Sequence, residues 1–243
     1  MRKIDLKAEA KFENRKADGE DIRRAQGKFY WATLLPTLNH MTVSCENINN
    51  HDVLEIGCAS GKDAVIYAKF AKSYIGIDIS DVAISNANKL GLSNCRFYCV
   101  DGHKLPLEDN SIDSVIVNSL LHHLDLNTVF AEIERVLKEE GRLIFREPLG
   151  TNPLFQLYRF FTPDARTVDE RPFTFDDLRL MRSYFHFENV CWFGFSSLLS
   201  AFLRIKIIRK FLTRFDDILS LTPLKYFFWQ FSGVAKLKNK QNL

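Results

Sequence analysis

The chain has 243 residues, of which 46% are apolar and 26% are charged, and its formal net charge is +3 at pH 7. This length accommodates one α/β domain with a full core and a modest appendage; the composition excludes wholesale disorder, and the small net charge gives no reason to expect a nucleic-acid partner. No two of the five cysteines have C-x-x-C spacing, so neither a zinc knuckle nor a thioredoxin-type motif is present, and no metal site is expected.

Residues 1–50 are predicted to form an N-terminal helical cap, polar at first and then apolar at Phe29–Leu35. The first residues are charged throughout and contain no apolar segment of the kind that a secretion signal needs. No stretch of the chain approaches about 18 uninterrupted apolar residues, so no membrane-spanning helix is predicted. A cytoplasmic location is therefore expected.

From residue 51 short β-branched runs alternate with helix-like stretches. The predicted strands are Asp52–Ile56, Ser73–Ile79, Cys95–Val100, Ser111–Asn118 and Gly141–Arg146. The predicted helices between them are Lys62–Ala71, Asp81–Leu90 and Thr128–Glu139. This alternation predicts an α/β fold with a doubly wound, Rossmann-like, mostly parallel sheet and helices on both faces, whose ligands bind outside the carboxyl ends of the strands.

The first strand leads into a glycine-containing loop, Gly57–Gly61, that opens a helix. Glycine allows a ligand to approach the backbone amides closely and tolerates positive φ, and free amides at a helix N-terminus suit a carboxylate or another anion. A turn after a strand often has this pattern without binding anything, so the loop alone is a weak signal.

Acidic residues end the next two strands. Asp78 follows the loop by about 20 residues, the spacing at which a carboxylate accepts hydrogen bonds from ribose hydroxyls. The alternative is that Asp78, with Ser80, only caps the next helix. Asp101 closes the third strand, so that Glu55, Asp78 and Asp101 are predicted to line one edge of the sheet. NAD is the poorer fit, because the second and third glycine positions of its G-x-G-x-x-G motif hold Ala59 and Lys62.

In combination these motifs resemble those of class I S-adenosylmethionine-dependent methyltransferases, in the small-molecule subgroup similar to the ubiquinone/menaquinone C-methyltransferases. The similar region runs from about Asp52 to Glu147 and includes Leu54-Glu55-Ile56-Gly57-Cys58-Ala59-Ser60-Gly61, Gly76-Ile77-Asp78-Ile79-Ser80, Asp101-Gly102-His103-Lys104-Leu105-Pro106, Asp113–Asn118, Leu121-His122-His123-Leu124 and Leu137–Leu143.

The resemblance implies S-adenosylmethionine as cofactor and S-adenosylhomocysteine as product. It implies that the first strand and the glycine loop hold the methionine part, that the second strand holds the ribose, that the third meets the adenine, and that the fourth ends beside the sulfonium. The candidate cofactor-binding residues are Glu55, Gly57, Cys58, Ala59, Gly61, Asp78, Ile79, Asp101, Gly102 and Asn118. Ala59 departs from the glycine that the family often has, which we expect to tune the fit without abolishing binding.

Methyl transfer from a sulfonium is an in-line displacement, in which orientation of the acceptor can supply about 7–11 kcal/mol. A base is needed only for a hydroxyl or an acidic carbon, and His122 and His123 follow the fourth strand at the ligand edge. They are candidate catalytic residues, and the alternative is that they pack against the loop or cap the helix around Thr128. Glu147 ends the fifth strand and is a third candidate that would face the acceptor. The alternative is that its carboxylate only pairs with Arg146 or a neighbouring amide.

The domain is predicted to span residues 51–195. Residues at about 150–175 are expected to form a lid over the acceptor; the alternative is that their aromatic side chains simply belong to the hydrophobic core. A helix at Thr174–Tyr184 and a strand at Phe187–Phe193 follow the lid, and Phe29-Tyr30-Trp31 is a candidate for closing the other side of the pocket.

Residues 196–243 are predicted to be a basic, amphipathic C-terminal extension. They contain nine basic residues and two acidic ones. One helical interpretation places Ala201, Ile205, Ile208, Leu212, Phe215 and Leu219 on an apolar face and Lys206, Lys210 and Arg214 opposite it. Such a segment either lies in a membrane interface through residues 196–230 and meets anionic lipid, or packs on the domain with its basic face solvated.

The predicted function is S-adenosylmethionine-dependent methyl transfer to a small-molecule or lipid-like acceptor. The alternative is a non-catalytic module that binds the cofactor or its product and acts through its basic tail on a membrane or a protein partner.

Overall fold

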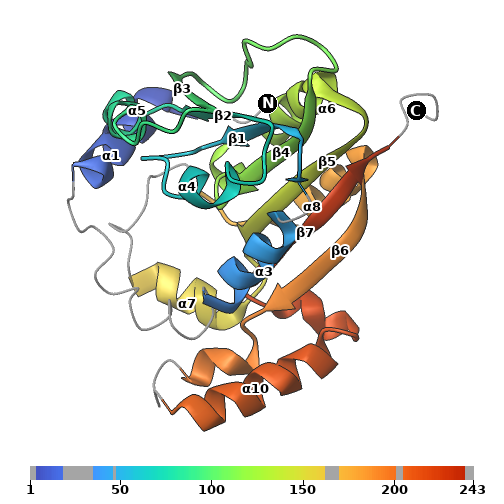
Figure 1. Cartoon of the computed structure of the whole chain (residues 1–243). Coiled ribbons are helices and arrows are strands. Elements are labelled where there is room, and N and C mark those ends of the chain that lie inside the picture. The colour runs from blue at the N-terminus through green and yellow to red at the C-terminus, as the bar shows by residue number, and fades with distance from the viewer. Residues whose placement is uncertain (1–3, 19–34, 46–47, 162–169, 201–204, 239–243) are drawn as a thin grey trace.

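A seven-stranded sheet in the order β3-β2-β1-β4-β5-β7-β6 forms the centre of the molecule (Figure 1). The computed structural model describes residues 4–18, 35–45, 48–161, 170–200 and 205–238. The strands are β1 (Asp52–Ile56), β2 (Ser73–Asp78), β3 (Cys95–Cys99), β4 (Ile112–Asn118), β5 (Leu137–Pro148), β6 (Phe185–Phe193) and β7 (Gln230–Leu237).

The first five strands are parallel, and the strand order reverses between β1 and β4. In such sheets the crevice for a ligand lies at the carboxyl ends of the strands on either side of the reversal. Successive strand residues are buried on opposite faces, as with Val53 and Leu54, which belong to two different apolar clusters. This double burial explains the continuous apolar runs in the sequence.

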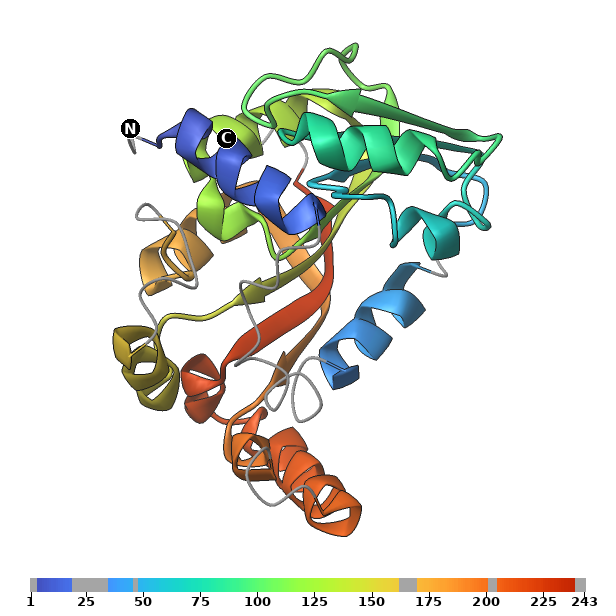
Figure 2. The same cartoon turned by 90° about the vertical axis from the view of Figure 1, so that its left-hand side faces the viewer.

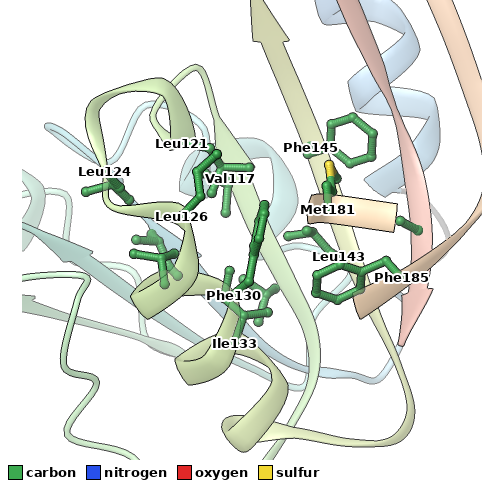
Figure 3. Packing of buried hydrophobic residues seen from close by; sticks show 14 of the residues in the cluster. Val117, Leu121, Leu124, Leu126, Phe130, Ile133, Leu143, Phe145, Met181 and Phe185 are labelled. Carbon is green, nitrogen blue, oxygen red and sulfur yellow. The ribbon is translucent and has the colours of Figure 1, made fainter. Parts of the chain in front are cut away.

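Helices cover both faces of the sheet. They are α1 (Leu6–Ala17), α3 (Leu35–Cys45), α4 (Ala64–Tyr67), α5 (Asp81–Asn88), α6 (Leu126–Val136), α7 (Pro153–Phe161), α8 (Phe175–Tyr184) and α10 (Lys206–Leu219). On one face Phe130 and Ile133 of α6 pack against strand residues such as Leu143, together with Met181 of α8 (Figure 3). The other face is covered by α3, α4 and α5. The predicted doubly wound fold is confirmed.

The helices between the strands are shorter than predicted, and the one expected at Asp81–Leu90 ends at Asn88. The helix expected at Thr128–Glu139 ends at Val136, because the buried Leu137 already pairs with Ile112 of β4. The ladder then shifts register before Ser114 pairs with Arg142, so β5 is longer than the expected Gly141–Arg146. The helix expected at Lys62–Ala71 is the single turn α4.

Strand β7 is the main correction to the predicted organisation. It lies in the segment 196–243 that is expected to be an extension, yet it is antiparallel to both β5 and β6 and joins them in the sheet. The sheet therefore does not end at residue 195. The strand escapes detection because its centre, Ser232-Gly233, interrupts the apolar pattern, although Phe231, Val234 and Ala235 are buried.

The amphipathic segment after residue 196 forms two helical pieces. A short 3-10 helix, η6, spans Ser196–Leu199, and α10 spans Lys206–Leu219; Ala201 lies outside the described residues. A further 3-10 helix, η7, spans Pro223–Phe227 and leads into β7. Among the described residues, no helix is long and apolar enough to cross a membrane.

Candidate functional site

A cleft opens at the carboxyl ends of β1, β2 and β4, at the reversal of the strand order. It consists of two adjoining cavities of about 210 and 310 Å³ that share Glu13, Lys16, Gly57, Ala59, Asp78 and Asn118. Helix α1 lies over the cleft beside α5 (Figure 2), because Asn14 donates a hydrogen bond to Asp81 and accepts one from Ser80. The contribution of α1 is not predicted by the sequence motifs. The predicted closure by Phe29-Tyr30-Trp31 falls outside the described residues.

The glycine loop is attached to the end of β2. The amides of Gly57 and Cys58 both donate to the carbonyl of Ile77, at 2.8 and 3.0 Å. Gly57 has a φ of +78°, and a Cβ at this position would lie 2.7 Å from Leu120 of the loop after β4. The backbone conformation therefore favours glycine, and any larger residue would also require the end of the Leu120 side chain to move. Ala59 also has positive φ, +45°, without the freedom of a glycine.

Asp78 joins the glycine loop to the start of α5. Its carboxylate accepts hydrogen bonds from the amide of Ala59 at 2.8 Å and from the amide of Ser80 at 2.9 Å. Burial raises the pKa of this carboxyl above its ordinary value. The cap of α5 is Ser80, whose hydroxyl accepts from the Ala83 amide. Asp78 therefore contacts the residue that caps α5, and the alternative of a capping role for Asp78 together with Ser80 stays open beside a role in ligand binding.

Glu55 is buried at the end of β1, where its carboxylate accepts a hydrogen bond of 2.7 Å from the hydroxyl of Tyr74. Burial, and then the charge of Asp63, raises the pKa of Glu55 well above its ordinary value. Asp63 in turn accepts a 2.7 Å hydrogen bond from the Asn118 side chain, and Asn118 accepts one from Arg146. Asp63 is a cleft residue that was not predicted from the sequence, although its place two residues after Gly61, at the start of a helix, indicates it.

Asp101 is held by its neighbour His103. The backbone amide and the Nδ1 atom of His103 lie 3.0 and 2.6 Å from the same carboxylate oxygen. The amide of Asp125 donates to Nε2 of that ring, so in the neutral imidazole the proton is on Nδ1 and is donated to Asp101. The loop after β3 is thereby tied to the residue that caps α6. Asp101, Gly102 and Ile79 all line the cleft.

The carboxylates of Glu55, Asp63, Asp78 and Asp101 thus line one cleft, together with those of Glu9 and Glu13 of α1. Their chemistry fits a ligand that carries both cationic groups and hydroxyl donors. A cation next to Glu55 and Asp63 would relieve the repulsion that raises the pKa of Glu55. An adenosyl sulfonium with an amino-acid tail supplies both kinds of group.

Glu147 organises the loop after β4 and does not line the described cleft. One of its oxygens accepts from the amides of Leu120 and Leu121, at 2.9 and 2.8 Å, and the other lies 2.7 Å from Nδ1 of His122. Burial raises the pKa of this fully buried carboxyl to about 7. These contacts agree with the alternative of a neighbouring amide as its partner. His122 is buried behind the cleft with it.

His123 is the histidine of the pair that lines the cleft. Its Nδ1 lies 3.0 Å from a carboxylate oxygen of Glu9 on α1, and its Nε2 lies 3.7 Å from one of Glu170. Glu170 is also paired with Arg159 of α7 at 2.8 Å. Glu9 and Glu170 were not predicted from the sequence, because they come from segments without a motif.

Among the described residues, one group of side chains could hold a metal ion. His122, His123 and Glu170 each offer one ligand atom, and these atoms lie within 4.8 Å of one another. Each histidine also contacts a carboxylate through Nδ1, as metal-bound histidines often do. The sequence predicts no metal, and that expectation stays a prediction.

Comparison with known proteins identifies the central region. Residues 54–145 match the family described as "Methyltransferase domain". The chain is 32% identical over 138 residues to the uncharacterized methyltransferase YcgJ of Bacillus subtilis, which covers 55% of this chain and 50% of the relative. It is 31% identical over 119 residues to the sterol 4-C-methyltransferase strm-1 of Caenorhabditis elegans, covering 46% of this chain and 36% of the relative. The chain therefore spans half of one relative and about a third of the other.

The similarity to known methyltransferase structures extends beyond residues 54–145 when the folds are compared. The crystal structure of the N-methyltransferase NodS from Bradyrhizobium japonicum in complex with S-adenosylhomocysteine has a TM-score of 0.64 and 14% identity. The alignment covers 95% of this chain and 98% of NodS. At this identity the likeness is one of fold. The comparisons confirm the resemblance to S-adenosylmethionine-dependent methyltransferases, and the resemblance to the ubiquinone/menaquinone subgroup stays a prediction.

The left-handed conformation of Ala59 leads to a stability prediction. Replacing Ala59 by glycine should raise the free energy of unfolding by about 1 kcal/mol, because an L-residue with positive φ is strained by about that amount. The melting temperature should rise by about 2–4 °C. The control is Ala131→Gly, at an exposed helical position of α6, which should lower stability by about 0.5–1 kcal/mol. A fall of similar size in both variants would contradict the assigned conformation.

The raised pKa of Glu147 leads to a pH prediction. Its carboxyl binds a proton more tightly in the folded protein, with a pKa of about 7, than at its ordinary value of 4.5. The stability that protonation contributes is complete below pH 4.5 and is lost as the pH rises towards 7. Relative to Glu147→Gln, the wild type should lose on the order of 3 kcal/mol over this window. Denaturant unfolding of both proteins at each pH measures the difference, and a difference that does not change with pH would refute the assignment.

Proposed function

We propose that this chain, whose residues 54–145 match a methyltransferase domain, transfers a methyl group from S-adenosylmethionine to a small-molecule acceptor. The observation that carries the proposal is the set of carboxylates in the cleft at the strand reversal. Glu55, Asp63, Asp78 and Asp101 come from separate segments of the chain and line the same cleft. The match of residues 54–145 and the fold shared with NodS support it.

Each of these acids has a proposed role in binding. Asp78 accepts hydrogen bonds from the ribose hydroxyls, using lone pairs that its two backbone contacts leave available. Glu55 and Asp63 stabilise the amino group of the methionine part. Asp101, oriented by His103, and the backbone at Gly102 meet the adenine. Asn118, held between Asp63 and Arg146, borders the reacting centre.

The cofactor supplies a methyl group already activated on a sulfonium, so the chain's main work is to orient the acceptor. For a hydroxyl or an acidic carbon, His123 accepts the acceptor's proton at an imidazole nitrogen. The carboxylates of Glu9 and Glu170 then stabilise the imidazolium. Glu147 and His122 act behind it: they hold the backbone of the loop that carries His123.

The proposed acceptor is a small or lipid-like molecule. A sterol methyltransferase is among the relatives, which supports an apolar acceptor. Residues 150–175 are the proposed lid, of which residues 162–169 lie outside the described residues. In the described part, α7 follows Asn152, and Arg159 of this helix pairs with Glu170, which lies beside His123. A lipid-linked acceptor would be met at a membrane surface, and peripheral membrane contact through residues 196–230 is part of the proposal.

Calorimetry with S-adenosylhomocysteine tests the cofactor site. The intact protein should bind it, and Asp78→Ala should weaken binding at least about tenfold, since hydrogen bonds to a charged group contribute about 1.5–3 kcal/mol. The matched control is Asp176→Ala, which removes an exposed carboxylate in α8 and should leave the affinity unchanged. Absence of binding by the wild type, or unchanged binding by Asp78→Ala, would reject the site.

Isotopic methyl incorporation tests catalysis and the role of His123. With labelled S-adenosylmethionine and a cell extract of small molecules and lipids, the wild type should label an extractable compound. His123→Gln should lower kcat about 100-fold or more while S-adenosylhomocysteine still binds, because a positioned base typically contributes that much. His186→Gln, at an exposed position of β6, is the control.

Two results would count against this scheme. Full activity of His123→Gln would show that orientation suffices and remove the base. Binding of the cofactor without incorporation of label into any compound would favour the non-catalytic module instead.

A further inference from the structure

The outer side of α10 is apolar although it faces solvent. Ile207 is 77% exposed, Phe211 69% and Ile218 63%, and Phe215 is exposed as well. These residues recur at helical spacing and form one stripe along the helix. Isolated exposed apolar residues are ordinary, but a continuous stripe of large ones marks a surface that contacts something.

A basic stripe runs beside the apolar one. Lys206, Lys210 and Arg214 are exposed and follow one another at intervals of four residues. With about 100° of rotation per residue, their directions lie on one flank of the apolar stripe and cover less than a third of the circumference. Asp217 is the exposed acid on the same flank. An apolar stripe with cations along its border is the arrangement of helices that lie in a membrane interface.

The inner side of α10 is fixed to the domain. Asp216 is buried and accepts hydrogen bonds from the amides of Phe195, Ser196 and Ser197, at 3.1, 2.7 and 3.1 Å. The helix is therefore attached to the domain through the hydrogen bonds of Asp216, while the apolar stripe faces solvent. The exposed stripe differs from the apolar face predicted from the sequence, because Ile208, Leu212 and Leu219 of that predicted face are half-buried. Packing of α10 on the domain and exposure of an apolar stripe therefore coexist.

Further exposed apolar residues lie at the same end of the molecule. Leu221, which follows α10, is 85% exposed, and Leu224 and Phe227 of η7 are exposed too. Helix α7 begins against η7, because the Asn152 side chain donates to the carbonyl of Phe227. Figures 1 and 2 place α7 and α10 at this end in both views. On α7 the exposed large apolar residues include Leu157, Phe160 and Phe161.

We propose that α10 docks this protein on the surface of an anionic lipid bilayer, with η7 and the outer side of α7 next to the same surface. The apolar stripe enters the boundary between head groups and acyl chains, and Lys206, Lys210 and Arg214 meet the anionic head groups. Charge complementarity favours a bilayer over a second copy of the chain. A second copy would place its own basic residues against those of the first, whereas anionic head groups are attracted to them.

The docking surface stands independently of the catalytic role. Its consequence for the acceptor rests on the proposed function: α7, at the docked end, is connected to the cleft through Arg159, Glu170 and His123. An acceptor carried in the bilayer would then approach the reacting centre beside α7. The class of acceptor to expect is a lipid or a lipid-linked molecule.

Vesicle co-sedimentation of the full chain tests the docking. The wild type should bind vesicles that contain phosphatidylglycerol and should bind neutral phosphatidylcholine vesicles at least about tenfold more weakly. Phe211→Ser/Ile218→Ser should lose binding to both kinds of vesicle. Lys206→Ala/Lys210→Ala should lose about tenfold or more on anionic vesicles only, since each basic residue near such a surface contributes roughly a factor of five. Rising salt should weaken the wild type in the same way.

Matched controls separate docking from misfolding and from the catalytic proposal. Ile66→Ser on α4 and Lys89→Ala after α5 alter an exposed apolar and an exposed basic residue elsewhere, and both should bind vesicles like the wild type. All the variants should melt like the wild type and bind S-adenosylhomocysteine unchanged, so that a loss of docking is distinct from a failure of the cleft.

Two outcomes would overturn the docking proposal. One is equal binding of the wild type to anionic and neutral vesicles, or binding to neither. The other is a dimer in light scattering that Phe211→Ser/Ile218→Ser converts to a monomer, which would assign the apolar stripe to a second copy of the chain.

Discussion

The candidate site depends on burying carboxylates at one edge of a parallel sheet. A buried carboxylate is costly unless donors surround it, and here the backbone supplies many of them. Asp78 receives the amides of Ala59 and Ser80, and Glu147 receives those of Leu120 and Leu121. Each acid therefore joins two segments of chain that meet at the strand ends. The same interactions that make the acids tolerable also set the shapes of the loops around the cleft.

The two adjacent histidines illustrate how this arrangement separates roles. His122 contacts Glu147 and is buried with it, whereas His123 lines the cleft between Glu9 and Glu170. Their rings lie 4.2 Å apart, so a change of charge on one is felt by the other. Adjacent positions in the sequence thus supply a structural contact and a candidate reactive group.

Periodicity and turn residues predicted the parallel half of the sheet, its strand ends and the acids at Glu55, Asp78 and Asp101, because these properties are local to each βαβ unit. The sequence did not indicate Asp63, Glu9 or Glu170 as cleft residues, since only the folded chain brings their segments to the cleft. It also missed β7: Ser232 and Gly233 have little strand preference, and the strand is stable because it has neighbours on both sides. The end of α6 at Val136 has the same origin, as pairing with β4 outweighs helix propensity.

The position of β7 has a consequence for how the protein is made. The last described strand of the chain lies between β5 and β6, so β6 has no neighbour in the sheet until β7 has been synthesised. On the ribosome the first five strands can assemble before residues 230–237 emerge from the exit tunnel. Until then β6 is unpaired, and the apolar surfaces of β6 and α10 are exposed. Completion of the sheet is therefore a late, long-range event, and nascent chains that stall before β7 are the ones that chaperones must protect.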